Sequence, residues 1–466
     1  MSFHSFQFIF AFIPVVVAGY AIWGRVSTDA ARAWLIFSSF VFYGWGAPRA
    51  LPVLAFSILF NYWVSTGLDP DIATSGRRLR LALVVNLLML GVFKYAGFAS
   101  SNVNAILGTH WSMQALILPL GISFFTVQQI MFLVDRHEGV APRPRFLDYV
   151  FFVSWFPYIV AGPITRWRDV VPQIPMKKVY LQDENLAQGT ALFLFGLTKK
   201  VILSSAFAPL VDAGFENPAG LGLMGAWMAT AGFGLQLYFD FSGYTDMARG
   251  AALLLNVNLP QNFNDPFRAL SITDFWQRWH ISLTNFITTY IYTPILRARR
   301  PTFRRAMFAT VVTMTIAGIW HGAGWGFALM GLWHGIGLAV HKAWTRYKKA
   351  LPDGLAWCVT AAFVLVGFSF FRAHSVSDAW TVIASMFNPA HLGGPALAKM
   401  TAGIDPTRLL TMLAAIGVLF YPASSSQVAA EATQRPRLAT ALAVCLFVCL
   451  LYMNSQPQEG FIYRQF

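Results

Sequence analysis

Charged residues are scarce in this sequence. Only 12% of its 466 residues are Asp, Glu, Lys or Arg, whereas 56% are hydrophobic and 16% are aromatic. Soluble domains carry about a quarter charged residues, so the composition excludes an ordinary soluble protein. The apolar residues form long runs rather than the weak alternation of an outer-membrane barrel. The sequence therefore predicts an all-α polytopic membrane protein.

The sequence has few cysteines and no internal repeat. The three cysteines, Cys358, Cys445 and Cys449, all lie within apolar runs. Cys445 and Cys449 are one helical turn apart, which favours packing over a disulfide, and no metal-ligand spacing occurs. The sequence shows no internal repeat, low-complexity tract or separate soluble stretch. We therefore expect no metal site and one membrane domain spanning residues 1–466.

Acidic residues are outnumbered by basic ones, which gives a net charge of +14. The basic residues cluster in short loops between apolar segments and form no stripe interleaved with aromatics, which argues against a nucleic-acid partner. Instead, the positive-inside rule predicts that the basic loops are cytoplasmic. The N-terminus has no basic stretch and no small-residue cleavage site, so we expect the first apolar segment to stay as a spanning helix.

The apolar runs predict a series of membrane crossings. Those predicted to cross about 30 Å of hydrocarbon are Phe8–Trp23, Ala33–Trp45, Leu51–Val64, Leu81–Phe98, Gly354–Phe371, Leu409–Tyr421 and Leu438–Tyr452. The run Phe151–Val160 has basic loops on both sides, so we expect it to re-enter the cytoplasmic face without crossing. The stretch Asp378–Phe387 is typical of an interfacial helix.

Two charged pairs interrupt apolar runs. Lys199 and Lys200 cannot face lipid, and we expect them to snorkel at a helix end, with contact to the phosphates of an anionic donor as the alternative. Asp240 and Asp246 flank a predicted Ser-Gly turn. Hydroxyl groups nearby can satisfy these carboxylates, so structural hydrogen bonding is the first interpretation and acid–base chemistry the second.

The stretch Phe275–Leu283 mixes aromatic residues with Arg278 and His280. Ser271 is a typical helix N-cap, and an interfacial amphipathic helix after it explains the tryptophans and the arginine. That interpretation accounts less well for His280. Packing and function both remain open for this histidine.

His321 lies within an apolar run and is followed by three glycines in five residues. Starting at the cytoplasmic Arg297–Arg305 loop, roughly 15 residues rising about 1.5 Å each reach Trp320, a climb of ~22 Å. His321 is therefore predicted beyond the midplane but inside the membrane, where ionisable groups are rare and usually functional. A structural histidine bonded to a carbonyl is the alternative. His334, about 20 Å lower on a regular helix, is predicted to be a packing or vestibule residue.

Several motifs together make the sequence similar to the membrane-bound O-acyltransferase (MBOAT) family, and specifically to its bacterial alginate O-acetylation branch. The motifs are Pro119–Phe125, Gly162–Ile164 with Arg166, Tyr238–Met247, Asn262–Pro266, Phe275–Leu283, Ile319–Trp325 and the tail Phe461–Phe466. The most specific are Trp-His-Ile-Ser and Trp-His-Gly-Ala, which contain His280 and His321. Arg464 departs from the aromatic residue that is usual in this branch.

The resemblance implies a bundle of roughly ten to twelve transmembrane or re-entrant helices around a central funnel. It implies His321 as the catalytic histidine and His280 as a second active-site histidine. Supporting residues within the same motifs are Trp320, Trp325, Arg278, Asp240 and Asn262. It also implies an enzyme of the bacterial inner membrane that acetylates an exported polysaccharide such as alginate. The donor would be acetyl-CoA on the cytoplasmic side, with periplasmic partner proteins and no bound cofactor.

Imidazole chemistry suits such a transfer. A neutral His321 can deprotonate the acceptor hydroxyl, and His280 can orient the acyl group or stabilise an oxyanion. Two alternatives stay open. One is D-alanyl transfer to teichoic acid from a carrier-protein thioester. The other is a transporter or export component, against which the sequence shows no inverted repeat and no run of intramembrane carboxylates.

Overall fold

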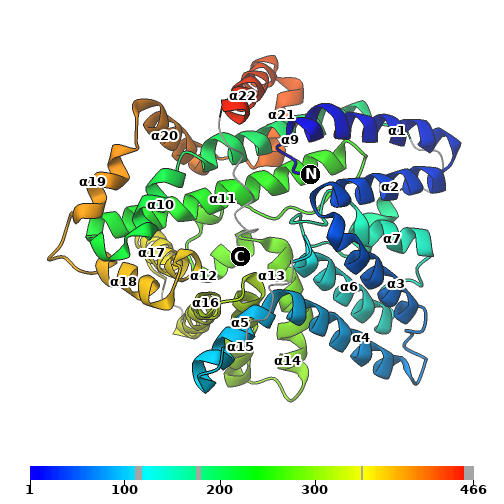
Figure 1. The fold of residues 1–466 in the computed structure, drawn as a ribbon, viewed down its shortest axis with the longest axis horizontal. Coiled ribbons are helices and arrows are strands. Elements are labelled where there is room, and N and C mark those ends of the chain that lie inside the picture. The colour runs from blue at the N-terminus through cyan, green and yellow to red at the C-terminus, as the bar shows by residue number, and fades with distance from the viewer. Residues whose placement is uncertain (111–117, 175–179, 348–349, 456–466) are drawn as a thin grey trace. The chain divides into compact units, whose positions relative to one another are not determined.

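The computed structural model describes residues 1–110, 118–174, 180–347 and 350–455 (Figure 1), and within them the chain is helical, with no strand. The tail motif Phe461–Phe466 and the basic residues Lys177, Lys178, Lys348 and Lys349 lie outside the described residues. The fold class predicted from composition is confirmed.

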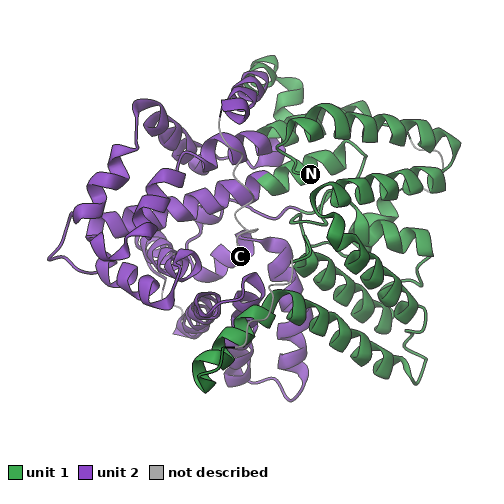
Figure 2. Cartoon of the chain, viewed as in Figure 1, with its two compact units in different colours: residues 1–195, 244–260, 428–442 green, residues 196–243, 261–427, 443–466 purple. Residues whose placement is uncertain are grey.

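The helices divide between two compact units, each built from several stretches of the chain (Figure 2). Unit 1 comprises residues 1–195, 244–260 and 428–442, and unit 2 comprises residues 196–243, 261–427 and 443–466. Two long helices, α9 (Asp183–Thr198) and α11 (Leu223–Leu253), pass from one unit into the other.

Unit 1 contains most of the helices of the first half of the chain. They are η1 (Phe8–Phe12), α1 (Ile13–Val26), α2 (Thr28–Gly46), η2 (Pro48–Ala50), α3 (Leu51–Ser65), α4 (Ser75–Leu90), η3 (Gly91–Tyr95), α5 (Ala96–Leu107), α6 (Ile122–His137), α7 (Phe146–Ser154), α8 (Trp167–Val170) and η4 (Val171–Gln173). The four predicted segments at the start are confirmed as helices. At nine residues, α7 rises only about 14 Å, and its predicted re-entrance stays a prediction.

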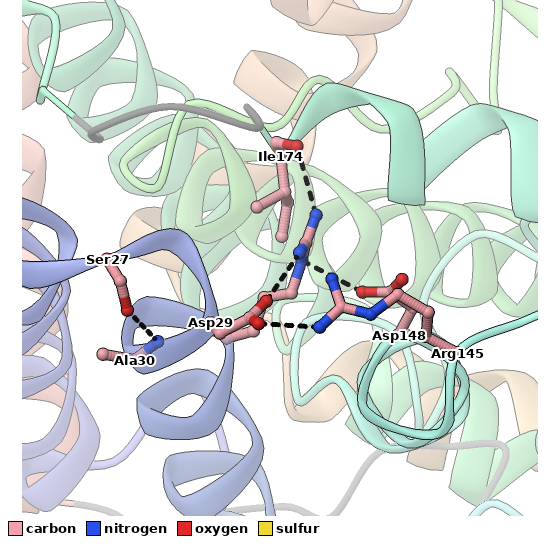
Figure 3. A network of polar contacts seen from close by, with 7 residues as sticks. Ser27, Asp29, Ala30, Arg145, Asp148 and Ile174 are labelled. Atoms are coloured by element: carbon pink, nitrogen blue, oxygen red, sulfur yellow. Dashed lines mark hydrogen bonds and ion pairs between the residues drawn. The ribbon is translucent and has the colours of Figure 1, made fainter.

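A network of polar contacts joins α2 to α7 within unit 1 (Figure 3). Arg32 lies 3.2 Å from Asp29 Oδ1 and 3.2 Å from Asp148 Oδ1, and its Nη2 donates to the Ile174 carbonyl at 3.5 Å. Arg145 Nη2 donates to Asp29 Oδ2 at 2.6 Å, and this hydrogen bond holds the pKa of the Asp29 carboxyl below its ordinary value. One charged cluster therefore connects α2, the N-terminal end of α7 and the end of η4.

Unit 2 contains the helices that carry the predicted site. Besides parts of α9 and α11 they are η5 (Lys199–Ser204), α10 (Ala208–Glu216), η6 (Pro218–Gly220), η7 (Pro266–Arg268), α12 (Ile272–Arg278), α13 (Ile281–Ile287), η8 (Thr288–Tyr292), α14 (Thr293–Arg297), α15 (Phe303–His321), α16 (Trp325–Trp344), η9 (Thr345–Tyr347), α17 (Asp353–Arg372), α18 (Val376–Met386), α19 (Pro395–Ala402) and α20 (Pro406–Phe420). Helices α21 (Ser425–Gln434) and α22 (Pro436–Ser455) cross between the units.

Several helices are long and apolar enough to cross a membrane. Among the described residues there are five such helices, or six if a pair bent by 94° forms one span. The five are Phe8–Val26, Ser75–Leu107, Asp183–Ser204, Asp353–Arg372 and Pro436–Ser455, and the bent pair is Pro395–Ala402 with Pro406–Phe420. The protein is therefore a multi-pass membrane protein, while the larger number of crossings and the central funnel stay predictions.

Candidate active site

His280 lies at the break between α12 and α13. The Ser271 hydroxyl accepts a hydrogen bond from the Asp274 amide at 3.1 Å, so the predicted N-cap of α12 is confirmed. The helix ends at Arg278, and His280 then takes left-handed backbone angles of φ 45° and ψ 53°. Such a conformation costs a residue with a side chain about 1–2 kcal/mol and persists where the surroundings impose it, typically at functional sites.

His321 is the last residue of α15, and the predicted glycine-rich break follows it. Gly322 and Gly324 are extended (φ −161° and −170°), and α16 begins at Trp325. The two helices pack tightly as an antiparallel pair. A Cβ added at Gly318 would lie 2.3 Å from the Phe327 carbonyl oxygen, and one at Gly331 only 2.4 Å from the Met314 carbonyl. These glycines are therefore required for close helix packing, which fixes the end of α15 and its imidazole.

The two breaks bring His280 and His321 together inside unit 2. Their ring centroids are 6.2 Å apart, with the rings tilted by 55°. Trp320 lies edge-on to His321 at 5.1 Å and is 6.4 Å from His280. Phe241 meets His280 at 4.8 Å and Phe371 meets His321 at 5.7 Å, both edge-on. The result is a pair of imidazoles in an aromatic shell, with His280 fully buried and His321 6% exposed.

Polar contacts at this pair converge on Asn262. Its Oδ1 lies 3.2 Å from His280 Nδ1 and accepts hydrogen bonds from the Ser282 amide at 3.1 Å and the Ser282 hydroxyl at 2.9 Å. Ser282 was not among the predicted site residues, although it lies two residues after His280 in the Trp-His-Ile-Ser motif. Phe241 and Phe371 were also missed, because only the fold brings their rings to the pair.

Two buried polar atoms at the site lack a hydrogen-bond partner among the described residues. They are His280 Nε2 and Asn262 Nδ2. Buried polar atoms are nearly always paired in native proteins, and exceptions often mark a site that a ligand or water completes. This pattern is typical of a binding or catalytic site and not of a histidine used only for packing.

Asp240 is paired with Lys200, and both side chains are only 4% exposed. Here two predictions are wrong. The lysines do not snorkel: Lys199 is also buried and its Nζ donates to Ser425 Oγ at 2.9 Å. Nor is there a turn at the Ser-Gly pair, because α11 continues from Leu223 to Leu253.

Packing explains why the Ser-Gly pair stays helical. A Cβ on Gly243 would lie 2.6 Å from the Gly196 carbonyl oxygen. The glycine therefore permits a close helix contact and does not end the helix. Asp240 immediately precedes Phe241, whose ring packs on His280, so the Lys200–Asp240 pair anchors α11 next to the residue that contacts the site.

The sequence also singled out Arg278, Trp325 and His334. Arg278 contacts Asp274 Oδ1 at 2.6 Å and the Asn264 carbonyl at 3.4 Å, which explains it structurally. Trp325 begins α16 and is 59% exposed. His334 is buried and Trp276 Nε1 donates to its Nδ1 at 3.4 Å, so the packing role predicted for it is confirmed. Over the described part of the chain, no three His, Cys, Asp or Glu side chains are grouped to hold a metal.

Comparison with known proteins shows which family this chain resembles. Residues 139–376 match the MBOAT, membrane-bound O-acyltransferase family. The peptidoglycan O-acetyltransferase of Helicobacter pylori is 38% identical over 83% of this chain and 80% of its own. The probable alginate O-acetylase of Azotobacter vinelandii is 33% identical over the full length of both chains. The teichoic acid D-alanyltransferase of Bacillus subtilis is 27% identical over 64% of this chain and 78% of its own.

The membrane fold and these relatives together show that the chain is an integral membrane O-acyltransferase. The chain belongs to the membrane-bound O-acyltransferase family, as its motifs predicted. Membership favours the acyl-transfer interpretation over the transporter or export component that the sequence left open.

Proposed function

We propose that this O-acyltransferase moves an acetyl group from acetyl-CoA, taken at the cytoplasmic side, to a hydroxyl group of an exported polysaccharide. The names of the Helicobacter and Azotobacter relatives support an acetyl group and a polysaccharide acceptor. The observation that carries the proposal is the buried His280–His321 pair, in which His280 Nε2 has no hydrogen-bond partner among the described residues. Such a pair provides proton transfer away from bulk water.

The chemistry needs only these groups and the two substrates. The hydroxyl oxygen attacks the thioester carbon, its proton passes to an imidazole, and the carbon–sulfur bond breaks as the ester bond forms. The imidazole then returns the proton to the departing thiolate. A thioester is already activated, so the scheme requires no bound cofactor. General base catalysis of this kind contributes typically about 10²–10⁴-fold.

Location and partners follow from this scheme. The protein would reside in the bacterial inner membrane with its basic loops cytoplasmic, as the positive-inside rule predicts. Acetyl-CoA is then available on the cytoplasmic side and the exported polymer on the other. Periplasmic partner proteins would present the polymer or receive the acetyl group.

Acetyl transfer in proteoliposomes tests the proposal. Purified protein is supplied with labelled acetyl-CoA and either alginate or peptidoglycan fragments, and label in the polymer is counted. We expect wild-type transfer to fall by about 10²-fold or more in His321→Ala. His374→Ala is the matched control, because His374 is exposed. Equal transfer by His321→Ala and wild type, at equal protein levels, would remove His321 from the mechanism.

D-alanyl transfer is the second candidate, supported by the relatives named teichoic acid D-alanyltransferase. Its donor would be a carrier protein's phosphopantetheine thioester. Supplying either D-alanyl-carrier protein or acetyl-CoA to the same proteoliposomes separates the two. Label transfer from the carrier protein alone would establish the second candidate and overturn the first.

A further inference from the structure

The orientation of the Asn262 amide is fixed by Ser282. The backbone N–H of Ser282 points at one terminal atom of that amide, 3.1 Å away. A backbone N–H can only donate, so the atom facing it is the carbonyl oxygen and not the NH₂ group. The Ser282 hydroxyl reaches the same atom at 2.9 Å. The identity of Oδ1 therefore follows from the chain itself.

That oxygen in turn determines where His280 carries its proton. Oδ1 lies 3.2 Å from His280 Nδ1, and an amide oxygen can only accept. Nδ1 must therefore hold the hydrogen. A neutral imidazole has one N–H, so Nε2 holds the lone pair and is a hydrogen-bond acceptor and base. The tautomer is set by the chain Ser282, Asn262, His280.

The protein leaves this lone pair without a donor. Nε2 is buried and has no hydrogen-bond partner among the described residues, and the side chain is fully enclosed. Of the rings that pack around it, Phe241 and Phe263 are hydrocarbon, and Trp320 and His321 lie on another side with ring centroids 6.4 Å and 6.2 Å away. A buried acceptor left unsatisfied costs about 1–3 kcal/mol, in addition to the left-handed backbone of His280. A substrate group that donates a hydrogen bond to Nε2 would offset the cost of the unsatisfied acceptor and would explain why the strained backbone of His280 is retained.

The distance to His321 allows one substrate oxygen to serve both rings. A ring nitrogen lies about 1.1 Å from its centroid, and an oxygen bonded to it lies about 2.8 Å further. Each ring therefore reaches an oxygen about 3.9 Å from its centroid. Twice that reach exceeds the 6.2 Å between the centroids. The separation of the rings therefore leaves both within reach of a single hydroxyl oxygen, provided that a nitrogen of each ring points toward it.

We propose that His280 Nε2 accepts the proton of the acceptor hydroxyl, and that Asn262 is the positioning residue that holds His280 in this tautomer. The inference rests on the proposed function, and it assigns the role of general base to His280. As the hydroxyl oxygen attacks the thioester carbon, its proton moves to Nε2 and the carbon–sulfur bond breaks. The imidazolium then returns this proton to the departing thiolate sulfur, which leaves as the thiol, and the ester bond is complete. An oxyanion-stabilising His280 would need an N–H at Nε2, which the neutral tautomer lacks.

Two substitutions at Asn262 test the tautomer without removing an imidazole. Asn262→Asp keeps an oxygen that faces Ser282 and the Nδ1–H, whereas Asn262→Leu removes every acceptor there. We expect Asn262→Leu to lower kcat by about 10²-fold or more, as loss of the correct tautomer does in other catalytic histidines. Asn262→Asp should stay within about tenfold of wild type, with the acidic limb of its pH–rate profile moved to higher pH, because a carboxylate favours the imidazolium.

Matched controls separate positioning from folding. Asn285→Leu makes the same change at an exposed position of α13 and should keep the wild-type rate. Ser282→Ala removes the hydroxyl bond but keeps the backbone N–H, so its loss should be much smaller than that of Asn262→Leu. Thermal unfolding in detergent checks each variant. If Asn262→Leu keeps the wild-type rate and pH profile, the positioning role is wrong.

A second measurement does not depend on activity. In ¹⁵N-histidine-labelled protein, the His280 signals are found by difference against His280→Asn. We expect Nδ1 protonated and Nε2 unprotonated in neutral wild type, and a changed tautomer in Asn262→Leu. A protonated Nε2 in neutral wild type would overturn the inference. If instead wild type transfers no acetyl group while the tautomer is as expected, the proposed function fails and the assignment of the proton stands.

Discussion

His280 reaches its place beside His321 from a left-handed backbone position, with the two ring centroids 6.2 Å apart. Neither residue lies in the middle of a helix: one follows the end of α12, and the other ends α15. Two helix ends held by packing can place side chains more rigidly than two mobile loops. The pair is therefore a product of the helix breaks as much as of the histidines.

The left-handed backbone of His280 predicts which substitutions preserve the fold. Asn tolerates this conformation and Ala does not. We expect His280→Asn to be inactive but to unfold near the wild-type temperature. His280→Ala should be inactive and also less stable than His280→Asn by about 1–2 kcal/mol. Thermal unfolding in detergent with a parallel transfer assay measures both. Equal stability of the two variants would show that the backbone at this position is not strained.

The buried Lys200–Asp240 pair predicts a non-additive effect. Removing one partner leaves an uncompensated buried charge, which typically costs about 3–5 kcal/mol. Lys200→Met should therefore be strongly destabilising and should impair transfer through Phe241, which packs on His280. The double variant Lys200→Met/Asp240→Leu should recover much of the stability, because neither position then carries a buried charge. Additive losses in the double variant, measured by thermal unfolding, would contradict this account.

The tight contact between α15 and α16 predicts different outcomes for two neighbouring glycines. Gly318→Ala places a methyl group 2.3 Å from a backbone oxygen, whereas at Gly324 the nearest atom is 3.5 Å away in the Phe327 ring. Overpacking typically costs about 1–3 kcal/mol. Gly318→Ala should thus lower stability and acyl transfer together, while Gly324→Ala should leave stability near wild type. Similar unfolding temperatures for the two variants would show that α15 and α16 have room to separate.

The buried Arg32–Asp148 ion pair of unit 1 can be tested in the same way as the Lys200–Asp240 pair. The Arg32 side chain is 7% exposed and its guanidinium contacts Asp148, whose side chain is 13% exposed. Arg32→Met leaves that carboxylate without its cation, so we expect a loss of stability of about 3–5 kcal/mol. Adding Asp148→Asn should restore part of it. No restoration in the unfolding temperature would indicate that Arg32 acts through its other contacts.

The Arg145–Asp29 hydrogen bond predicts a small acid-dependent loss of stability. Arg145 holds the pKa of Asp29 below its ordinary value in the folded protein. The contribution of Asp29 is therefore present above its unfolded pKa of about 3.9 and disappears as the pH falls through the lower folded value. Arg145→Gln should flatten this part of the profile of unfolding temperature against pH. An unchanged profile in Arg145→Gln would assign the acid sensitivity to other carboxylates.

Local features of the structure could be predicted from the sequence. The Ser271 cap and the glycine-rich break after His321 are where they were expected, because capping side chains and runs of apolar residues act on their own neighbourhood. The family motifs also pointed to both histidines. The long apolar runs predicted a helical membrane protein, since hydrocarbon leaves the backbone few other ways to satisfy its polar groups.

Other features were decided by contacts between distant segments. The Ser-Gly pair after Asp240 stays helical because Gly243 allows a close approach to Gly196, and Lys200 is buried because Asp240 neutralises it. The proton on His280 is assigned by Asn262 and Ser282, which meet it only in the folded chain. The sequence by itself determined which side chains are available for acyl transfer. The tertiary structure alone decided their partners, because pairing depends on packing and burial across many residues and not on local propensity.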